Sequence, residues 1–127
     1  MTADILIVDD NAVQAATRRA VLLRSGKNVV TASSAHQALE FLDDQELSAS
    51  LGMVITDHYM PGMNGPEFVD LLRRRFSHIP VLVLSGLADA ESEYEEMGVF
   101  FRLKPFPPED LILLVSSLLD EPMSRTA

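Results

Sequence analysis

The chain has 127 residues, 47% of them hydrophobic and 23% charged, a composition typical of one globular domain. Ten basic residues against nineteen acidic ones give a formal net charge of -9, which argues against direct nucleic-acid binding. The sequence has no cysteine, no signal-peptide pattern and no apolar run near the roughly 20 residues of a membrane span. We therefore expect a cytoplasmic protein that binds neither nucleic acid nor membrane.

The first third of the chain alternates between strand and helix patterns. Residues 4–8 form an apolar, β-branched run that predicts a strand. A helix is expected over 12–24, after Asn11 as its N-cap, and a second strand over 28–32. Apolar residues recur at helical spacing in this helix, namely Val13, Ala16, Ala20 and Leu23.

The middle of the chain continues this alternation. Ser34 is typical of a helix N-cap, and the helix is expected to run to about Leu42, with residues 43–52 as its polar end and a loop. A third strand then ends at Asp57. After a turn over 60–65, the sequence predicts a helix that ends in three arginines at 73–75.

The last third predicts strands at 79–84 and 99–103 and a final helix at 109–119. The segment 88–97 is helix-like but acidic, so we expect it to pack weakly. Five strand-helix alternations predict a doubly wound α/β fold with a parallel sheet and helices on both faces. We expect one domain at 1–120 and a tail at 121–127.

Polar residues stand where the predicted strands end. These residues are Asp9, Asp10, Asp57, Ser85 and Lys104. Because the carboxyl ends of parallel strands lie at one edge of a sheet, we expect three carboxylates, a hydroxyl and an ammonium to meet there.

Such a cluster suits phosphoryl transfer to a carboxylate. Three neighbouring carboxylates repel one another unless a cation is present, and Mg²⁺ prefers oxygen ligands. One carboxylate can then attack phosphorus, with Lys104 balancing charge and Ser85 donating a hydrogen bond. The sequence contains no phosphate-binding Gly-x-x-x-x-Gly-Lys-Ser/Thr loop, so the phosphoryl donor is expected to be another molecule.

The motifs Asp9-Asp10, Asp57 with Met60 to Gly65, Ser85-Gly86 and Lys104-Pro105-Phe106 together resemble the response regulator receiver domain of two-component signalling. The resemblance covers residues 4–119 and implies a flavodoxin-like (βα)5 fold with strand order 2-1-3-4-5. It implies that Asp57 is the phosphoacceptor, which receives its phosphoryl group from a sensor histidine kinase or a histidine phosphotransfer protein.

The same resemblance implies further site roles. It implies Mg²⁺ held by Asp10, Asp57 and the backbone carbonyl of Tyr59, with Asp9 assisting. It also implies a cis peptide between Lys104 and Pro105. It gives Ser85 and Phe101 the role of a switch, and we expect Phe101, which has no hydroxyl, to favour its inward position even before phosphorylation.

Two side chains beside the site are expected to tune the lifetime of the phosphoryl group. In the family these positions flank the path of the attacking water, and here they hold Tyr59 and Leu87. Because an aromatic and an apolar group orient water poorly, we expect slow self-dephosphorylation. The alternative is that both residues merely cover the site.

The final helix has more apolar residues than one buried stripe needs. We expect a surplus apolar surface, made of Phe100, Ile112, Leu113 and Leu119. The resemblance implies that this face, formed by the segment 88–97, the fifth strand and the last helix, dimerises or binds a downstream effector. The alternative is a wide core face or cover from the tail.

Two other functions fit parts of the pattern. An aspartate-nucleophile phosphohydrolase also uses a carboxylate, Mg²⁺, Ser/Thr and Lys, but usually has a second acid where this chain has Tyr59. A receiver-like scaffold without phosphorylation would not need the full polar set. We therefore expect a phosphoacceptor rather than an enzyme, either alone or as part of a larger regulator, since no output segment follows Leu119.

Overall fold

The fold was analysed in a computed structural model, in which residues 1–120 are described; the predicted tail at 121–127 lies outside them. One parallel sheet of five strands has the order β2-β1-β3-β4-β5. Its strands are β1 Ile5–Val8, β2 Val29–Ala32, β3 Met53–Asp57, β4 Val81–Ser85 and β5 Phe100–Leu103. This confirms the predicted fold class and strand order.

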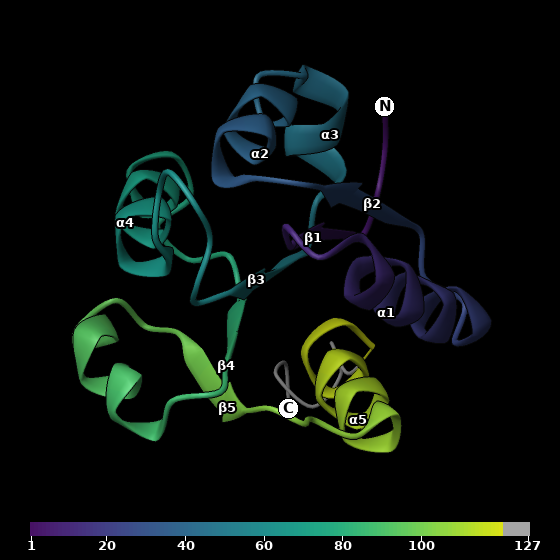
Figure 1. Ribbon diagram of the computed structural model, residues 1–127. Coiled ribbons are helices and arrows are strands. Elements are labelled where there is room, and N and C mark those ends of the chain that lie inside the picture. The colour runs from purple at the N-terminus through teal and green to yellow at the C-terminus, as the bar shows by residue number, and fades with distance from the viewer. Residues whose placement is uncertain (121–127) are drawn as a thin grey trace, which may run out of the picture.

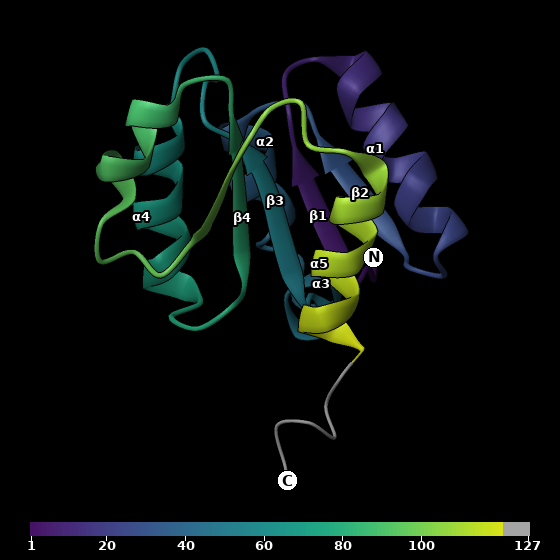
Figure 2. The same cartoon turned by 90° about the horizontal axis from the view of Figure 1, so that it is seen from below.

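Helices cover both faces of this sheet, α1 and α5 one face and α2, α4 and η1 the other (Figures 1 and 2). The helical segments are α1 Ala12–Arg24, α2 Ala35–Phe41, α3 Gln45–Ser50, α4 Gly65–Arg75, η1 Ala88–Tyr94 and α5 Pro108–Leu119. The central strands are buried throughout, because helices on both faces of a parallel sheet leave neither face exposed to solvent. Two apolar clusters, one on each face, form the core.

The structure corrects two expectations for secondary structure. Residues 45–50 form a short helix, α3, in a segment predicted to be helix end and loop; Asp44 caps it and Leu47 is its buried residue. The segment after β4 forms a 3-10 helix, η1, in place of a longer α-helix. The burial of Ala90 and Tyr94 shows that η1 is packed more firmly than its acidic sequence indicates.

The apolar residues at helical spacing in α1 do not form its core face. Val13 is 75% exposed and Leu23 is 40% exposed, whereas Ala15 and Leu22 are buried against the sheet. Arg18 lies three residues after Ala15 and four before Leu22, which places it on the same inward face. The apolar stripe read from the sequence therefore faces solvent, and a charged side chain occupies the inward face.

Arg73 joins α4 to the chain before and after β4. Its guanidinium donates to the carbonyl oxygens of Phe76, Ile79, Met97 and Gly98, at 2.7 to 3.2 Å. Burial lowers the pKa of Arg73 from its ordinary value. The side chain fixes the end of α4 against the turn that leads into β5.

Candidate functional site

Two buried carboxylates lie next to each other at the carboxyl ends of the central strands. Asp9 directly follows β1, Asp57 is the last residue of β3, and both are at least 97% buried. Parallel pairing of β1 with β3 sets these strand ends side by side. Asp10 is exposed, but an oxygen of each of the three carboxylates lies within 4.8 Å of the others. The structure thus brings together the three acids singled out in the sequence.

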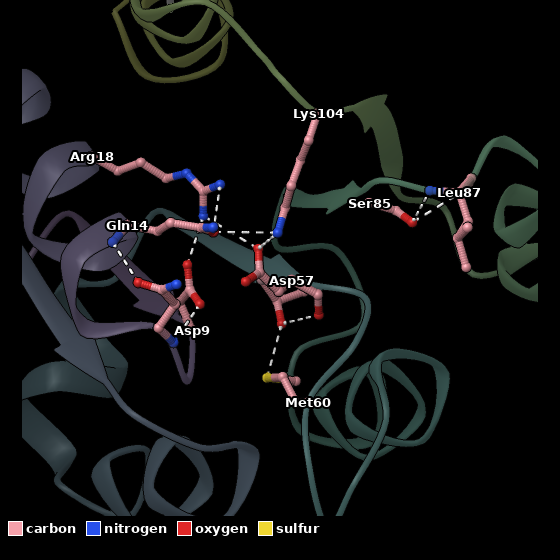
Figure 3. A network of polar contacts seen from close by, with 10 residues as sticks. Asp9, Gln14, Arg18, Asp57, Met60, Ser85, Leu87 and Lys104 are labelled. Carbon is pink, nitrogen blue, oxygen red and sulfur yellow. Dashed lines mark hydrogen bonds and ion pairs between the residues drawn. The ribbon is translucent and has the colours of Figure 1, made fainter.

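Two cations reach Asp57 (Figure 3). Lys104 Nζ and Arg18 Nη1 each lie 3.2 Å from Asp57 Oδ1. Arg18 Nη1 also donates to Asp9 Oδ2 at 2.9 Å. Gln14 Oε1 accepts from both cations, at 3.3 Å from Lys104 and 3.4 Å from Arg18. Lys104 could be predicted from the sequence, but Arg18 and Gln14 could not, because the apolar spacing in α1 marks its exposed face and not the face that carries these two residues.

The hydroxyl of Ser85 is hydrogen-bonded to the backbone of Leu87. Ser85 Oγ accepts from the Leu87 N–H at 3.0 Å and donates to the Leu87 carbonyl at 3.3 Å. Ser85 is buried at the end of β4, and the Lys104 N–H donates to its carbonyl at 2.8 Å. The backbone therefore ties these two residues together at the site edge. The Lys104–Pro105 peptide bond is cis, the geometry that the resemblance implies.

Burial raises the pKa of Asp9 to about 7, and the neighbouring Asp57 adds to the rise. The Asn11 N–H, which donates to Asp9 Oδ1 at 2.8 Å, and the charge of Arg18 act in the opposite direction without cancelling it. Together Asp9, Asp10 and Asp57 can carry three negative charges, one more than Arg18 and Lys104 balance, which favours a proton or a further cation here.

These donors fit a hard divalent cation. Three carboxylates offer oxygen ligands within a small region, and one of them, Asp10, is exposed and open to water. Mg²⁺ takes a few carboxylates and keeps several waters, which matches this donor set. The acidic cluster can therefore hold a metal ion.

Aromatic side chains cluster around His58, the residue that follows Asp57. Tyr94 of η1 is buried, and its hydroxyl lies 2.6 Å from His58 Nδ1, beside the phosphoacceptor candidate. The Tyr94 and Phe101 rings are 6.0 Å apart between centroids, and Phe101 is buried. A Cβ on Gly65 would overlap the Tyr94 hydroxyl. Tyr94 could not be predicted from the sequence, because a single aromatic residue in an acidic segment gives no periodic signal.

The candidate lifetime-tuning residues are both at the surface. Tyr59 is 78% exposed and Leu87 is 61% exposed.

The surplus apolar surface is smaller than expected. Leu113 is 67% exposed, but Phe100 and Leu119 pack against the core and Ile112 is half-buried. None of the helices in the part of the chain that the structure describes is long and apolar enough to cross a membrane.

Comparison with protein families gives a match that covers nearly the whole chain. The family model for the response regulator receiver domain matches residues 5–116. Among curated proteins, the chain is 32% identical to the response regulator protein FleR of Pseudomonas aeruginosa, over 91% of this chain but 24% of FleR. It is 35% identical to the two-component response regulator ORR6 of Oryza sativa, over 90% of this chain and 69% of ORR6. The chain spans about a quarter of FleR, a much longer protein.

Solved structures share the fold. A response regulator receiver protein from Pseudomonas putida superposes with a TM-score of 0.82 at 30% identity, covering 92% of this chain and 98% of that one. The chemotaxis protein CheY4 of Vibrio cholerae gives a TM-score of 0.81 at 27% identity, covering 94% of this chain and all of that one.

Proposed function

Since this chain belongs to the response regulator receiver domains of two-component signalling, we propose that its Asp57 accepts a phosphoryl group from a histidine kinase or a histidine phosphotransfer protein. One observation carries the proposal: Asp57 is buried at a strand end with Asp9 and Asp10 on one side and Lys104 3.2 Å away on the other. Receiver domains are signalling domains. We propose that this one is itself phosphorylated, in the cytoplasm, and does not convert a separate substrate.

Phosphoryl transfer here needs positioning more than covalent machinery. An oxygen of Asp57 forms the new bond to phosphorus while the phosphorus–nitrogen bond of the donor breaks and leaves imidazole. Lys104 is placed to stay beside Asp57 and neutralise a phosphoryl oxygen. Ser85 reaches that group only after its hydroxyl leaves Leu87.

We propose that Mg²⁺ binds in the acidic pocket, that is, the cluster of Asp9, Asp10 and Asp57. Asp10, Asp57 and the backbone carbonyl of Tyr59 would hold the ion, with Asp9 assisting. Bound Mg²⁺ supplies positive charge to the phosphoryl oxygens. The support is the donor set itself, three carboxylates whose oxygens lie close together.

The output is proposed to pass through Ser85 and Phe101 to the face formed by η1, β5 and α5. Phe101 is buried beside Tyr94, so any movement of its ring changes the packing of η1. On this face Leu113 is the most exposed large apolar side chain. We propose that a downstream effector or a second copy of the chain binds there, with Phe100, Ile112 and Leu119 at the edge of the contact.

Incubation with Mg²⁺ and phosphoramidate, followed by intact-protein mass spectrometry, tests the proposal. The expected result is the addition of one phosphoryl group per chain, lost completely in Asp57→Asn. Asp70→Asn removes an exposed carboxylate on α4 that pairs with Arg74, and it should be phosphorylated like the wild type.

The alternatives predict different results in the same assay. A phosphohydrolase would release phosphate over many turnovers without accumulating a modified chain. A scaffold without phosphorylation would show no mass change at all. Modification that persists in Asp57→Asn would place the acceptor elsewhere and overturn the proposal.

The lifetime of the phosphoryl group gives a separate prediction. Replacing both Tyr59 and Leu87, as in the double variant Tyr59→Asn with Leu87→Glu, should speed dephosphorylation about tenfold, which corresponds to about 1.4 kcal/mol in the barrier. The reason is that an amide and a carboxylate can orient an attacking water, whereas a phenol ring and an alkyl chain orient it poorly. Release of phosphate after removal of the donor measures the rate.

Leu113→Glu is the matched control for this pair. It puts the same charge on another exposed leucine, on α5 and outside the acidic pocket, and should leave the rate unchanged. Equal decay rates in the wild type and the double variant would rule the prediction out.

A further inference from the structure

The inward face of α1 carries a cation into the acidic pocket. Arg18 lies between Ala15 and Leu22, which are buried against the sheet. Its side chain is only 16% exposed. A buried guanidinium is costly unless it is paired, so this position is explained by the carboxylates it meets.

One guanidinium nitrogen bridges the two buried acids. Arg18 Nη1 lies 2.9 Å from Asp9 Oδ2 and 3.2 Å from Asp57 Oδ1. The other Asp9 oxygen accepts from the Asn11 N–H, so both oxygens of Asp9 are engaged. Arg18 brings one positive charge to this position. It stands between two of the three carboxylates that a divalent cation would share.

There is space for the guanidinium to leave. A cavity of about 490 Å³ lies between α1 and the start of α5, and Gln14, Arg18 and Lys104 are among its lining residues. The rest of the lining is largely apolar, with Val13, Val21 and Phe106 contributing. The long arginine stem can rest on such a surface while its head moves towards solvent.

We propose that Arg18 is a resident counter-ion of the pocket, which Mg²⁺ must displace from Asp9 and Asp57 in order to bind. Arg18 is thus a positioning residue that lowers the Mg²⁺ affinity of the free protein and sets the metal concentration at which phosphotransfer begins. The inference rests on the proposed function, because it assigns a regulator to the same site.

Calorimetric titration of the metal-free protein with MgCl₂ tests the inference. Arg18→Met should bind Mg²⁺ at least about tenfold more tightly, because a unit charge a few ångströms from the ion is removed. Arg18→Gln should shift affinity in the same direction. Its amide can still donate to Asp9, which keeps the test valid where the methionine variant does not fold.

Arg19→Met is the matched control. It removes the same charge from the next residue of α1, whose guanidinium donates to the Val29 carbonyl, and should stay within about twofold of the wild-type affinity, as expected for a screened surface charge. A second readout is the Mg²⁺-induced rise in melting temperature, which should be larger in the Arg18 variants than in the wild type.

The outcomes separate this inference from the proposed function. Unchanged or weaker Mg²⁺ binding in both Arg18 variants would overturn the counter-ion role, while phosphorylation of Asp57 by phosphoramidate would still stand. Failure of all the proteins to bind Mg²⁺ would overturn both the inference and the metal assignment. Tighter binding in the Arg18 variants alone supports the inference.

Discussion

Gly65→Ala should lower the free energy of unfolding by about 3 kcal/mol, because it displaces a buried tyrosine. An added Cβ overlaps the Tyr94 hydroxyl and lies 3.0 Å from the His58 carbonyl oxygen. The backbone of His58 cannot rotate away, so Tyr94 has to leave its buried position and its contact with His58 Nδ1. Urea denaturation of the wild type and the variant measures the loss.

A double-mutant cycle identifies the cause. Tyr94→Phe removes the clashing hydroxyl but keeps the ring beside Phe101, so Gly65→Ala should cost at most about half as much in that background. Gly86→Ala is the matched glycine control, because a Cβ there meets no atom within 4 Å. An equal cost of Gly65→Ala in both backgrounds would show that the hydroxyl is not the obstacle.

The second large effect is on the pH dependence of stability without Mg²⁺. Asp9 has a pKa of about 7 in the folded chain, whereas an unfolded aspartate loses its proton near a pH of about 4. The stability that protonated Asp9 contributes is complete below about pH 4 and is lost as the pH rises to about 7. Asp9→Asn should therefore gain stability over the wild type by up to about 3 kcal/mol between about pH 5 and pH 8.

Thermal melts of both proteins across this pH range check the prediction. The wild type and Asp9→Asn should differ least at the acidic end. Saturating Mg²⁺ should narrow the gap at the alkaline end, because a cation favours the carboxylate. A gap that stays constant or shrinks as the pH rises would contradict the assignment of the high pKa to Asp9.

The sheet and the main site residues could be predicted from the sequence. Each strand is a short apolar run, and each site residue stands at or directly after a strand end, so topology alone brings Asp9, Asp57 and Lys104 together. The face of α1 that packs against the sheet could not be predicted in this way. Its small apolar residues, such as Ala16 and Ala20, mark no clear core face, and the buried face includes Arg18 because its partners come from β1 and β3.

The segment between β4 and β5 was predicted least well. Its acidic sequence indicated a weakly packed helix, but Tyr94 is held by partners that lie far away in the chain, at His58 and Gly65. Such a contact depends on the absence of a side chain at Gly65, and local periodicity contains no information about it. Local periodicity did not indicate α3 either, because Leu47 is the one buried residue of this short helix.

The backbone bond between Ser85 and Lys104 bears on how such a chain can diverge. The Lys104 N–H donates to the Ser85 carbonyl, and the neighbouring Leu84 carbonyl accepts from the His58 N–H, so the residues that carry the hydroxyl and the ammonium share one backbone frame with the end of β3. Insertions or deletions within η1 begin and end outside that frame. Changes in the length of this segment can therefore accumulate between relatives and remodel the proposed partner-binding face, while the spacing of Asp57, Ser85 and Lys104 stays unchanged.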